Sequence, residues 1–272
     1  MTRLEIAPRT KKSATEIIAL PAFTDNYIWL LRHAGQVAVV DPGDAAPVLD
    51  YLAKSGDRLC AVVVTHHHAD HIGGIAGIIA DHPAPVYGPA NENIAAISHP
   101  LRDGDHLDLP ALDVAFEVIA VPGHTLDHIA YYSPTLGEAG AVFCGDTLFA
   151  AGCGRIFEGT PAQMYASLHR LAVLPAPTFV YCAHEYTASN LRFALAVEPD
   201  NPALRQRNEA VTAARAKGQA TVPSQITVEL ETNPFLRVDA PAVRAAAPAQ
   251  LGRPPVDALE SFAAIREWKN RF

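Results

Sequence analysis

Short hydrophobic segments rich in β-branched and aromatic residues recur along the first two thirds of the chain. Most are nearly continuous apolar runs, which is the pattern of strands buried on both faces of a sheet. The predicted strands cover residues 16–20, 26–31, 36–41, 60–65, 84–88, 113–121, 128–133, 140–146 and 178–185. Because helical segments lie between some of them, the pattern predicts a layered α/β core.

Three helices in this part of the chain carry boundary signals. Residues 45–56 end in a glycine, and residues 73–82 follow a histidine-rich stretch. Residues 160–174 open with Thr160 as the N-cap and Pro161 at the first helical position. These signals predict helices that connect the strands.

From about residue 187 the pattern changes to segments rich in Ala, Arg and Glu with helical spacing. The predicted helices there cover residues 188–200, 201–219, 240–250 and 255–272. We therefore expect a disordered tail at 1–14, an α/β domain at 15–186 and a helical domain at 187–272.

Composition narrows the classes of function. The 272 residues are 49% hydrophobic, yet no window is long and apolar enough to predict a membrane span, and the N-terminus does not resemble a secretory signal. A net charge of −8 without a basic run argues against nucleic-acid binding. The cysteines form no CxxC pair, which is typical of free thiols in a reducing compartment. We expect a cytoplasmic protein without membrane or nucleic-acid partners, and a monomer by default.

The segment "THHHADH" is the strongest chemical signal. While the chain stays extended, His66 and His68 share a face and His67 points the other way. A glycine pair follows, and at this turn Asp70 and His71 can face the same point as the first two. Hence four of the five are candidate metal ligands, and His67 is predicted to be structural.

Three other predicted strands each deliver a potential ligand at their carboxyl end, namely His124, Asp146 and His184. A histidine-rich turn alone can be an ordinary polar loop, but ligands collect at this edge of layered α/β sheets. Five imidazoles and two carboxylates suit two divalent ions such as zinc, iron or manganese, each with a position open to water.

This series of HxHxDH, PGHT, GD and a final histidine resembles the metallo-β-lactamase superfamily from about residue 23 to the C-terminus. Within it the chain looks most like the glyoxalase II family, the hydroxyacylglutathione hydrolases. The segments that carry this resemblance are "FTDNYIWLL", "THHHADHIGG", "GDTLFAAGCGRIFEGT", "CAHEYT", "NPFLR" and "REWK". It implies a four-layer αβ/βα sandwich with a helical C-terminal domain.

The resemblance also implies a pair of metal ions, with zinc expected first and iron or manganese as alternatives. One ion would be held by His66, His68 and His124, the other by Asp70, His71 and His184, with Asp146 bridging both. Asp70 and Asp146 would position a hydroxide between the ions. That hydroxide would cleave S-(2-hydroxyacyl)glutathione, typically S-D-lactoylglutathione, to glutathione and a 2-hydroxy acid in the second step of methylglyoxal detoxification.

Five residues are implied as substrate contacts. Arg155, Arg266 and Lys269 would bind the anionic glutathione, although the last two also suit the negative end of a helix dipole. Tyr186 would supply an aromatic contact, with core packing as the alternative. Phe157 stands where many relatives carry a tyrosine.

Some alternatives stay open. The chain could be another hydrolase of this fold, a thioesterase or lactonase, a mononuclear iron persulfide dioxygenase, or an inactive binding protein. Ala69 stands where relatives often have Trp or Asn, and Asp127 where they have a small residue, which leaves the acyl preference and the metal open. Asp41 is expected to support a ligating histidine.

Overall fold

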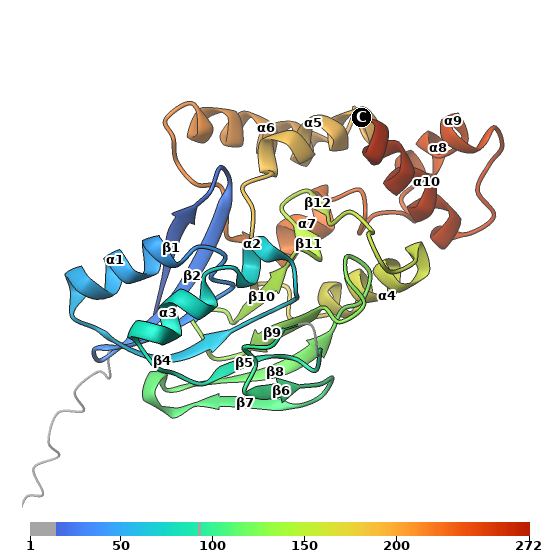
Figure 1. Ribbon diagram of the computed structural model, residues 1–272. Coiled ribbons are helices and arrows are strands. Elements are labelled where there is room, and N and C mark those ends of the chain that lie inside the picture. Colours follow the sequence, from blue (N-terminus) through green and yellow to red (C-terminus); the bar gives the residue numbers. More distant parts are fainter. Residues whose placement is uncertain (1–14, 92–93) are drawn as a thin grey trace, which may run out of the picture.

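The computed structural model describes residues 15–91 and 94–272, and the tail predicted at 1–14 lies outside them. Two six-stranded sheets lie face to face, with helices on their outer sides (Figure 1). The first sheet contains, in order, β1 (Glu16–Ala22), β2 (Asn26–His33), β3 (Gln36–Val40), β4 (Arg58–Val63), β5 (Val86–Pro89) and β6 (His99–Leu101). The second contains β14 (Ser224–Gln225), β13 (Phe179–Cys182), β10 (Ala141–Gly145), β9 (Ile129–Ser133), β8 (Val114–Ala120) and β7 (His106–Leu109).

Alternate side chains of the first sheet enter two different cores. Trp29 and Leu31 on β2 join the core between the sheets. Leu30 joins the core beneath α1 (Ala45–Ser55) and α3 (Ile75–Asp81). A strand that is apolar on both faces therefore fits between two layers, which confirms the predicted four-layer αβ/βα sandwich.

The helix boundary signals are confirmed. The Asp44 side chain caps α1 at its start, and Gly56 ends it in the left-handed conformation at φ 70°. At α4 (Pro161–Ala172), Thr160 and Gln163 form a reciprocal capping box. These caps satisfy backbone groups that a helix end leaves open.

The C-terminal region is helical, as predicted, with one helix, α7, and one strand that the pattern did not reveal. Its helices are α5 (Thr187–Val197), α6 (Pro202–Arg215), α7 (Ile226–Thr232), α8 (Pro241–Ala246), α9 (Pro248–Leu251) and α10 (Ala258–Arg271). The short strand β14 pairs antiparallel with β13, so this region also completes an edge of the second sheet. A domain boundary near residue 187 stays a prediction.

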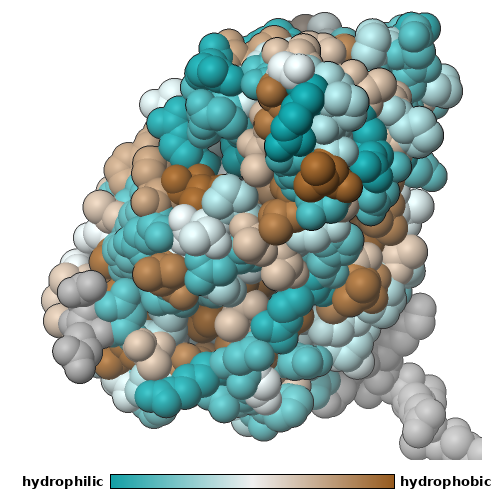
Figure 2. Space-filling view, turned by 90° about the vertical axis from the view of Figure 1, so that its right-hand side faces the viewer, coloured by the Kyte–Doolittle hydropathy of each residue, from teal (hydrophilic) through white to brown (hydrophobic). Residues whose placement is uncertain are grey.

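The face that carries α8 to α10 is mostly hydrophilic. In Figure 2 the hydrophobic side chains on this face form small separate patches. Among the described helices, none is long and apolar enough to cross a membrane.

Candidate metal centre

Four strands deliver the predicted ligands to one edge of the sandwich. β4 ends shortly before His66, and β8, β10 and β13 end shortly before His124, Asp146 and His184. β8 and β10 both run antiparallel to β9, and β13 runs parallel to β10, so these three strands point the same way. Their carboxyl ends consequently meet, as expected for a site at the edge of layered sheets.

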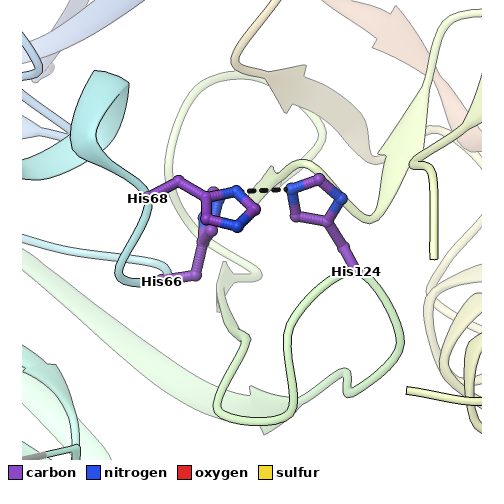
Figure 3. A group of neighbouring side chains, drawn as sticks. All are labelled: His66, His68 and His124. Carbon is purple, nitrogen blue, oxygen red and sulfur yellow. Dashed lines mark hydrogen bonds between the residues drawn. The ribbon is translucent and has the colours of Figure 1, made fainter. Parts of the chain in front are cut away.

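Three histidines form the first part of the centre. The ligand-capable ring nitrogens of His66, His68 and His124 lie within 4.8 Å of one another. Nε2 of His124 is 2.9 Å from Nδ1 of His68, and the three rings converge from two different loops (Figure 3). We call this set the three-histidine group.

A carboxylate and two histidines form the second part. Asp70 and His71 belong to the single-turn helix α2 (Ala69–Ile72), and His184 follows β13. Oδ2 of Asp70 is 3.6 Å from Nε2 of His71 and 3.5 Å from Nε2 of His184. We call Asp70, His71 and His184 the mixed group.

Asp146 lies between the two groups. Its Oδ2 is 3.4 Å from Nε2 of His124 and 3.3 Å from Nε2 of His184, while its Oδ1 is 3.4 Å from Nε2 of His71. Gly145, at φ 47°, places it there, because a Cβ at that position would lie 2.4 Å from Oγ1 of Thr65. The structure thus brings all seven predicted ligands together.

Most of the histidines predicted as ligands are oriented through their outer nitrogen. Nδ1 of His71 is 3.1 Å from Oδ2 of Asp41, which confirms the expected support by that residue, and Nδ1 of His184 is 2.8 Å from Oδ1 of Asp25. In the three-histidine group, Nδ1 of His124 donates to the Arg155 carbonyl at 2.7 Å, and Nδ1 of His66 is 3.1 Å from the Thr65 hydroxyl. These contacts turn each Nε2 towards the centre.

The donor set fits divalent metal ions. Nε2 of His66, Nε2 of His71 and Oδ1 of Asp146 are buried and have no hydrogen-bond partner within the described part of the chain. Buried polar atoms are normally satisfied, so unpartnered atoms that face one another indicate a missing ligand. Imidazole and carboxylate donors in two adjoining groups support a binuclear divalent-metal site.

The histidines of the three-histidine group favour the neutral state. Burial lowers the pKa of His66 well below its ordinary value, and the nearby His71 adds to this shift. Burial likewise lowers the pKa values of His68 and His124. Their rings are therefore neutral near pH 7 and free of a competing proton.

In the mixed group the pKa values of the histidines are raised instead of lowered. Burial works to lower the pKa of His71, but Asp146 and Asp41 raise it well above its ordinary value. In the same way burial is outweighed at His184, whose pKa is raised by Asp146 and Asp25. Burial alone would raise the pKa of Asp146, yet His71 and His184 hold it well below its usual range. In the mixed group, the neighbouring carboxylates therefore favour the protonated form of both histidines.

A cavity of about 620 Å³ opens onto the centre. Five of the seven ligands line it, together with Phe149 and three predicted substrate contacts, Arg155, Phe157 and Tyr186. The Tyr186 ring stacks on His184 with centroids 4.7 Å apart and stays 36% exposed, so it is not a core residue. The exposed Phe157 ring faces His124 at 5.2 Å.

The other two predicted substrate contacts do not line this cavity. Arg266 is 6% exposed and donates to the carbonyls of Cys153 at 2.9 Å and Gly154 at 3.3 Å. It therefore holds the loop that leads into Arg155. Nζ of Lys269 lies 5.2 Å from the Phe193 ring, and burial together with Arg266 lowers its pKa to about 8.

Three further residues at the centre were not predicted from the sequence. The Asp146 N–H donates to Nε2 of His128 at 3.1 Å, and burial lowers the pKa of His128 to about 3, so its ring is a neutral acceptor. Asn26 donates to Oδ2 of Asp70 at 3.0 Å, and Asp25 contacts His184. Asp25 and Asn26 lie in the motif "FTDNYIWLL" and His128 begins the predicted strand at 128–133, but nothing in the local pattern separates them from strand and turn residues.

His67 contacts two carboxylates outside the set of seven predicted ligands, and its structural or ligand-supporting role stays a prediction. Its Nδ1 is 2.9 Å from Oδ1 of Asp127 and its Nε2 is 3.0 Å from Oε1 of Glu158. Asn91 also donates to Asp127, at 2.6 Å. The ligand-capable atoms of His67, Asp127 and Glu158 also lie within 4.8 Å of one another. Both ring nitrogens of His67 already have a carboxylate partner, in contrast to Nε2 of His66 and Nε2 of His71.

Known proteins share both the sequence and the fold. Residues 22–184 match a family model described as "Metallo-beta-lactamase superfamily", and residues 185–272 match "Hydroxyacylglutathione hydrolase C-terminus". The hydroxyacylglutathione hydrolase of Pseudomonas aeruginosa is 56% identical over 260 residues, which cover 94% of this chain and 99% of the relative. That of Cupriavidus taiwanensis is 56% identical, covering 93% and 97%. The crystal structure of ETHE1 from Myxococcus xanthus matches at a TM-score of 0.63 and 27% identity, covering 93% of this chain and 90% of that one.

Proposed function

This chain belongs to the hydroxyacylglutathione hydrolases of the metallo-beta-lactamase superfamily, and we propose from this premise that it hydrolyses S-(2-hydroxyacyl)glutathione. The products are glutathione and a 2-hydroxy acid. S-D-lactoylglutathione is the substrate to test first, which would place the enzyme in the second step of methylglyoxal detoxification. The observation that carries the proposal is the convergence of seven ligand side chains beside a cavity that also presents Arg155.

The proposed metal ligands are divided between two ions. The three-histidine group would hold one ion, the mixed group the other, and Asp146 would contact both. When bound, two divalent ions polarise a carbonyl group and lower the pKa of water. We propose zinc because histidine and carboxylate donors suit it, and iron or manganese remain the alternatives.

The reaction forms a bond between water oxygen and the thioester carbonyl carbon and breaks the carbon–sulfur bond. Burial alone would raise the pKa of Asp70, but His71 and the Asn26 hydrogen bond lower it, so the carboxylate is ionised at neutral pH. Asp70 lines the cavity and can accept a hydrogen bond from the attacking water. The leaving thiolate needs no strong acid, since thiols have pKa values near ~8.5.

Arg155 is the proposed anchor for a glutathione carboxylate. Its guanidinium carbon lies 5.9 Å from the Phe157 ring at the cavity wall, and its carbonyl fixes His124. Phe157 and Tyr186 would contact the tripeptide through their rings. Direct contacts by Arg266 and Lys269 stay predictions, and the contacts described above support a role for Arg266 in positioning the Arg155 loop.

The decisive experiment compares thioester and ester substrates. Metal-loaded enzyme should cleave S-D-lactoylglutathione, lose this activity with a chelator, and regain it with zinc. Simple esters and lactones should be poor substrates, and oxygen consumption with a glutathione persulfide should be absent. A fully loaded enzyme that leaves S-D-lactoylglutathione intact would overturn the proposal, and preferred turnover of a lactone or a persulfide would favour those alternatives.

Four further proposals concern metal content, assembly, location and domains. Native, unsupplemented protein should contain mainly zinc by elemental analysis. The chain should be a monomer in light scattering, and it should act in the cytoplasm, which agrees with four free cysteines. Residues 15–186 would form the catalytic domain and 187–272 the substrate-binding domain, which limited proteolysis can test.

A further inference from the structure

A second cavity adjoins the metal centre, and Arg155 is not among the described residues that line it. It measures about 450 Å³, and its lining includes Phe23, Ala69 and Tyr186 together with the ligands Asp70 and His184. Asp70, His184 and Tyr186 also line the first cavity. The mixed group therefore lies at the junction of two cavities.

The two cavities differ in chemistry. Arg155 lines the first, whereas the described residues that line the second include no lysine or arginine. A thioester likewise has two unlike halves joined at the reacting carbonyl: an anionic glutathionyl group and an acyl group. If the carbonyl lies at the junction, each half enters the cavity that suits its charge.

Resting on the proposed hydrolysis, we propose that the second cavity binds the acyl group, and that Phe23 and Ala69 adapt it to 2-hydroxyacyl groups with a bulky apolar substituent. Ala69 leaves the cavity wall open because its side chain is a single methyl group. A lactoyl group would fill only a small part of the space, while an aromatic 2-hydroxyacyl group could pack against Phe23.

The hairpin backbone that carries Phe23 is held by contacts of the neighbouring residues. Phe23 lies at the tip of the β1–β2 hairpin, where Ala22 and Asn26 form the last pair, and its ring is 60% exposed. Its backbone has φ 52°, a strained conformation for a bulky residue. Such strain persists where neighbouring contacts fix the chain, and it gathers at binding sites.

Those contacts come from the metal centre. Asp25 bonds His184, and Asn26 donates to Asp70. The Glu185 N–H also donates to the Asp25 carbonyl at 2.9 Å. The hairpin that rises beside α2 in Figure 1 is thus tied to the predicted ligands, so the backbone that carries Phe23 is fixed next to the second cavity.

The test compares two thioesters with the same leaving group, S-lactoylglutathione and S-mandeloylglutathione, on the metal-loaded full chain. Ala69→Trp should fill the second cavity and lower kcat/KM for the mandeloyl substrate about tenfold more than for the lactoyl substrate. Phe23→Ala should raise the KM for the mandeloyl substrate several-fold more than for the lactoyl substrate. Inhibition by free glutathione should keep its strength in both variants, since the first cavity is unaltered.

Ala213→Trp is a matched control, because Ala213 is an exposed alanine on α6 that lines neither cavity. It should leave the ratio of the two substrates unchanged. Equal losses for both substrates in Ala69→Trp, or weaker inhibition by glutathione, would overturn the acyl site while the hydrolase function stands. If the unaltered, metal-loaded enzyme cleaves neither thioester, the proposed function fails and the acyl site with it.

Discussion

The two halves of the metal centre are built from similar donors but held in different ways. The three-histidine group is oriented by a backbone carbonyl and a hydroxyl, those of Arg155 and Thr65. In the mixed group the histidines are oriented by carboxylates, those of Asp41 and Asp25. The histidines of one half therefore favour the neutral state, while in the other half carboxylates raise the pKa values of the histidines.

This difference indicates how strongly protons compete with a metal ion for the ligand atoms of each half. Neutral histidines can accept a metal near pH 7 without releasing a proton. A histidine whose pKa is raised must first lose its proton, although the carboxylates then stabilise the metal cation that replaces it. The mixed group should consequently bind its ion more tightly at high pH and release it first on acidification.

The largest effect should come from removing the residue that joins the halves. Asp146→Ala should lose metal from both groups, and kcat for lactoylglutathione should fall roughly a thousandfold or more, because several kcal/mol of Lewis-acid stabilisation disappear. Metal content and kcat are measured together. Asp127→Ala removes a nearby carboxylate that bonds His67 and Asn91 and is not one of the seven predicted ligands, and it should keep two ions. Two ions in Asp146→Ala would show that this residue does not join the halves.

The metal affinities of the two groups should also depend differently on pH. His124→Ala removes a residue of the three-histidine group and keeps the mixed group intact. His184→Ala does the reverse, so each group can be measured separately. The pKa of His71 is raised, so below that value it is protonated, and metal affinity of the mixed group should fall about tenfold for each pH unit and each proton displaced. The pKa of His66 is lowered, so the three-histidine group should change little between about pH 6 and pH 8. Competition with a chelator at several pH values measures both slopes, and equal slopes would contradict the assignment.

How much of this centre the sequence reveals depends on distance along the chain. His124, Asp146 and His184 each follow a buried strand, so strand ends and residue types alone predict them. Asp25 could not be found in that way, because its partner His184 lies 159 positions away and the contact depends on how the hairpin tip meets another strand.

The same limit applies to the C-terminal helix. Helical spacing correctly places Arg266 and Lys269 on related faces, but spacing does not say what the helix packs against. In the structure Arg266 faces the carbonyls of Cys153 and Gly154, since the loop after β11 (Leu148–Phe149) and β12 (Gly152–Cys153) passes beneath it. Periodicity predicts elements and their faces, whereas tertiary packing selects the partner.

The third prediction tests the charge of one outer carboxylate. Asp25→Asn keeps an acceptor for Nδ1 of His184 but removes the negative charge, so the mixed group should lose about tenfold to a hundredfold in metal affinity. Its pH slope should also become shallower, because the pKa of His184 is no longer raised by that charge. The measurement uses the His124→Ala background. Unchanged affinity and slope would show that Asp25 acts only as a scaffold.

The smallest effect is expected in the three-histidine group. Thr65→Val removes the hydroxyl that lies 3.1 Å from Nδ1 of His66 and donates to Oδ2 of Asp41 at 2.7 Å. The Thr65 backbone N–H still donates to Oδ1 of Asp41 at 2.7 Å, and in a background without His184 the loss at Asp41 bears on the mixed group, not on the three-histidine group. Because a neutral hydrogen bond contributes only about 1 kcal/mol, metal affinity of the three-histidine group should fall a few-fold, less than in Asp25→Asn. Thr178→Val, measured in the same His184→Ala background, is the matched control, since the buried Thr178 hydroxyl has no partner among the described residues. A loss as large as that of Asp25→Asn would mean that orientation, and not charge, separates the two halves.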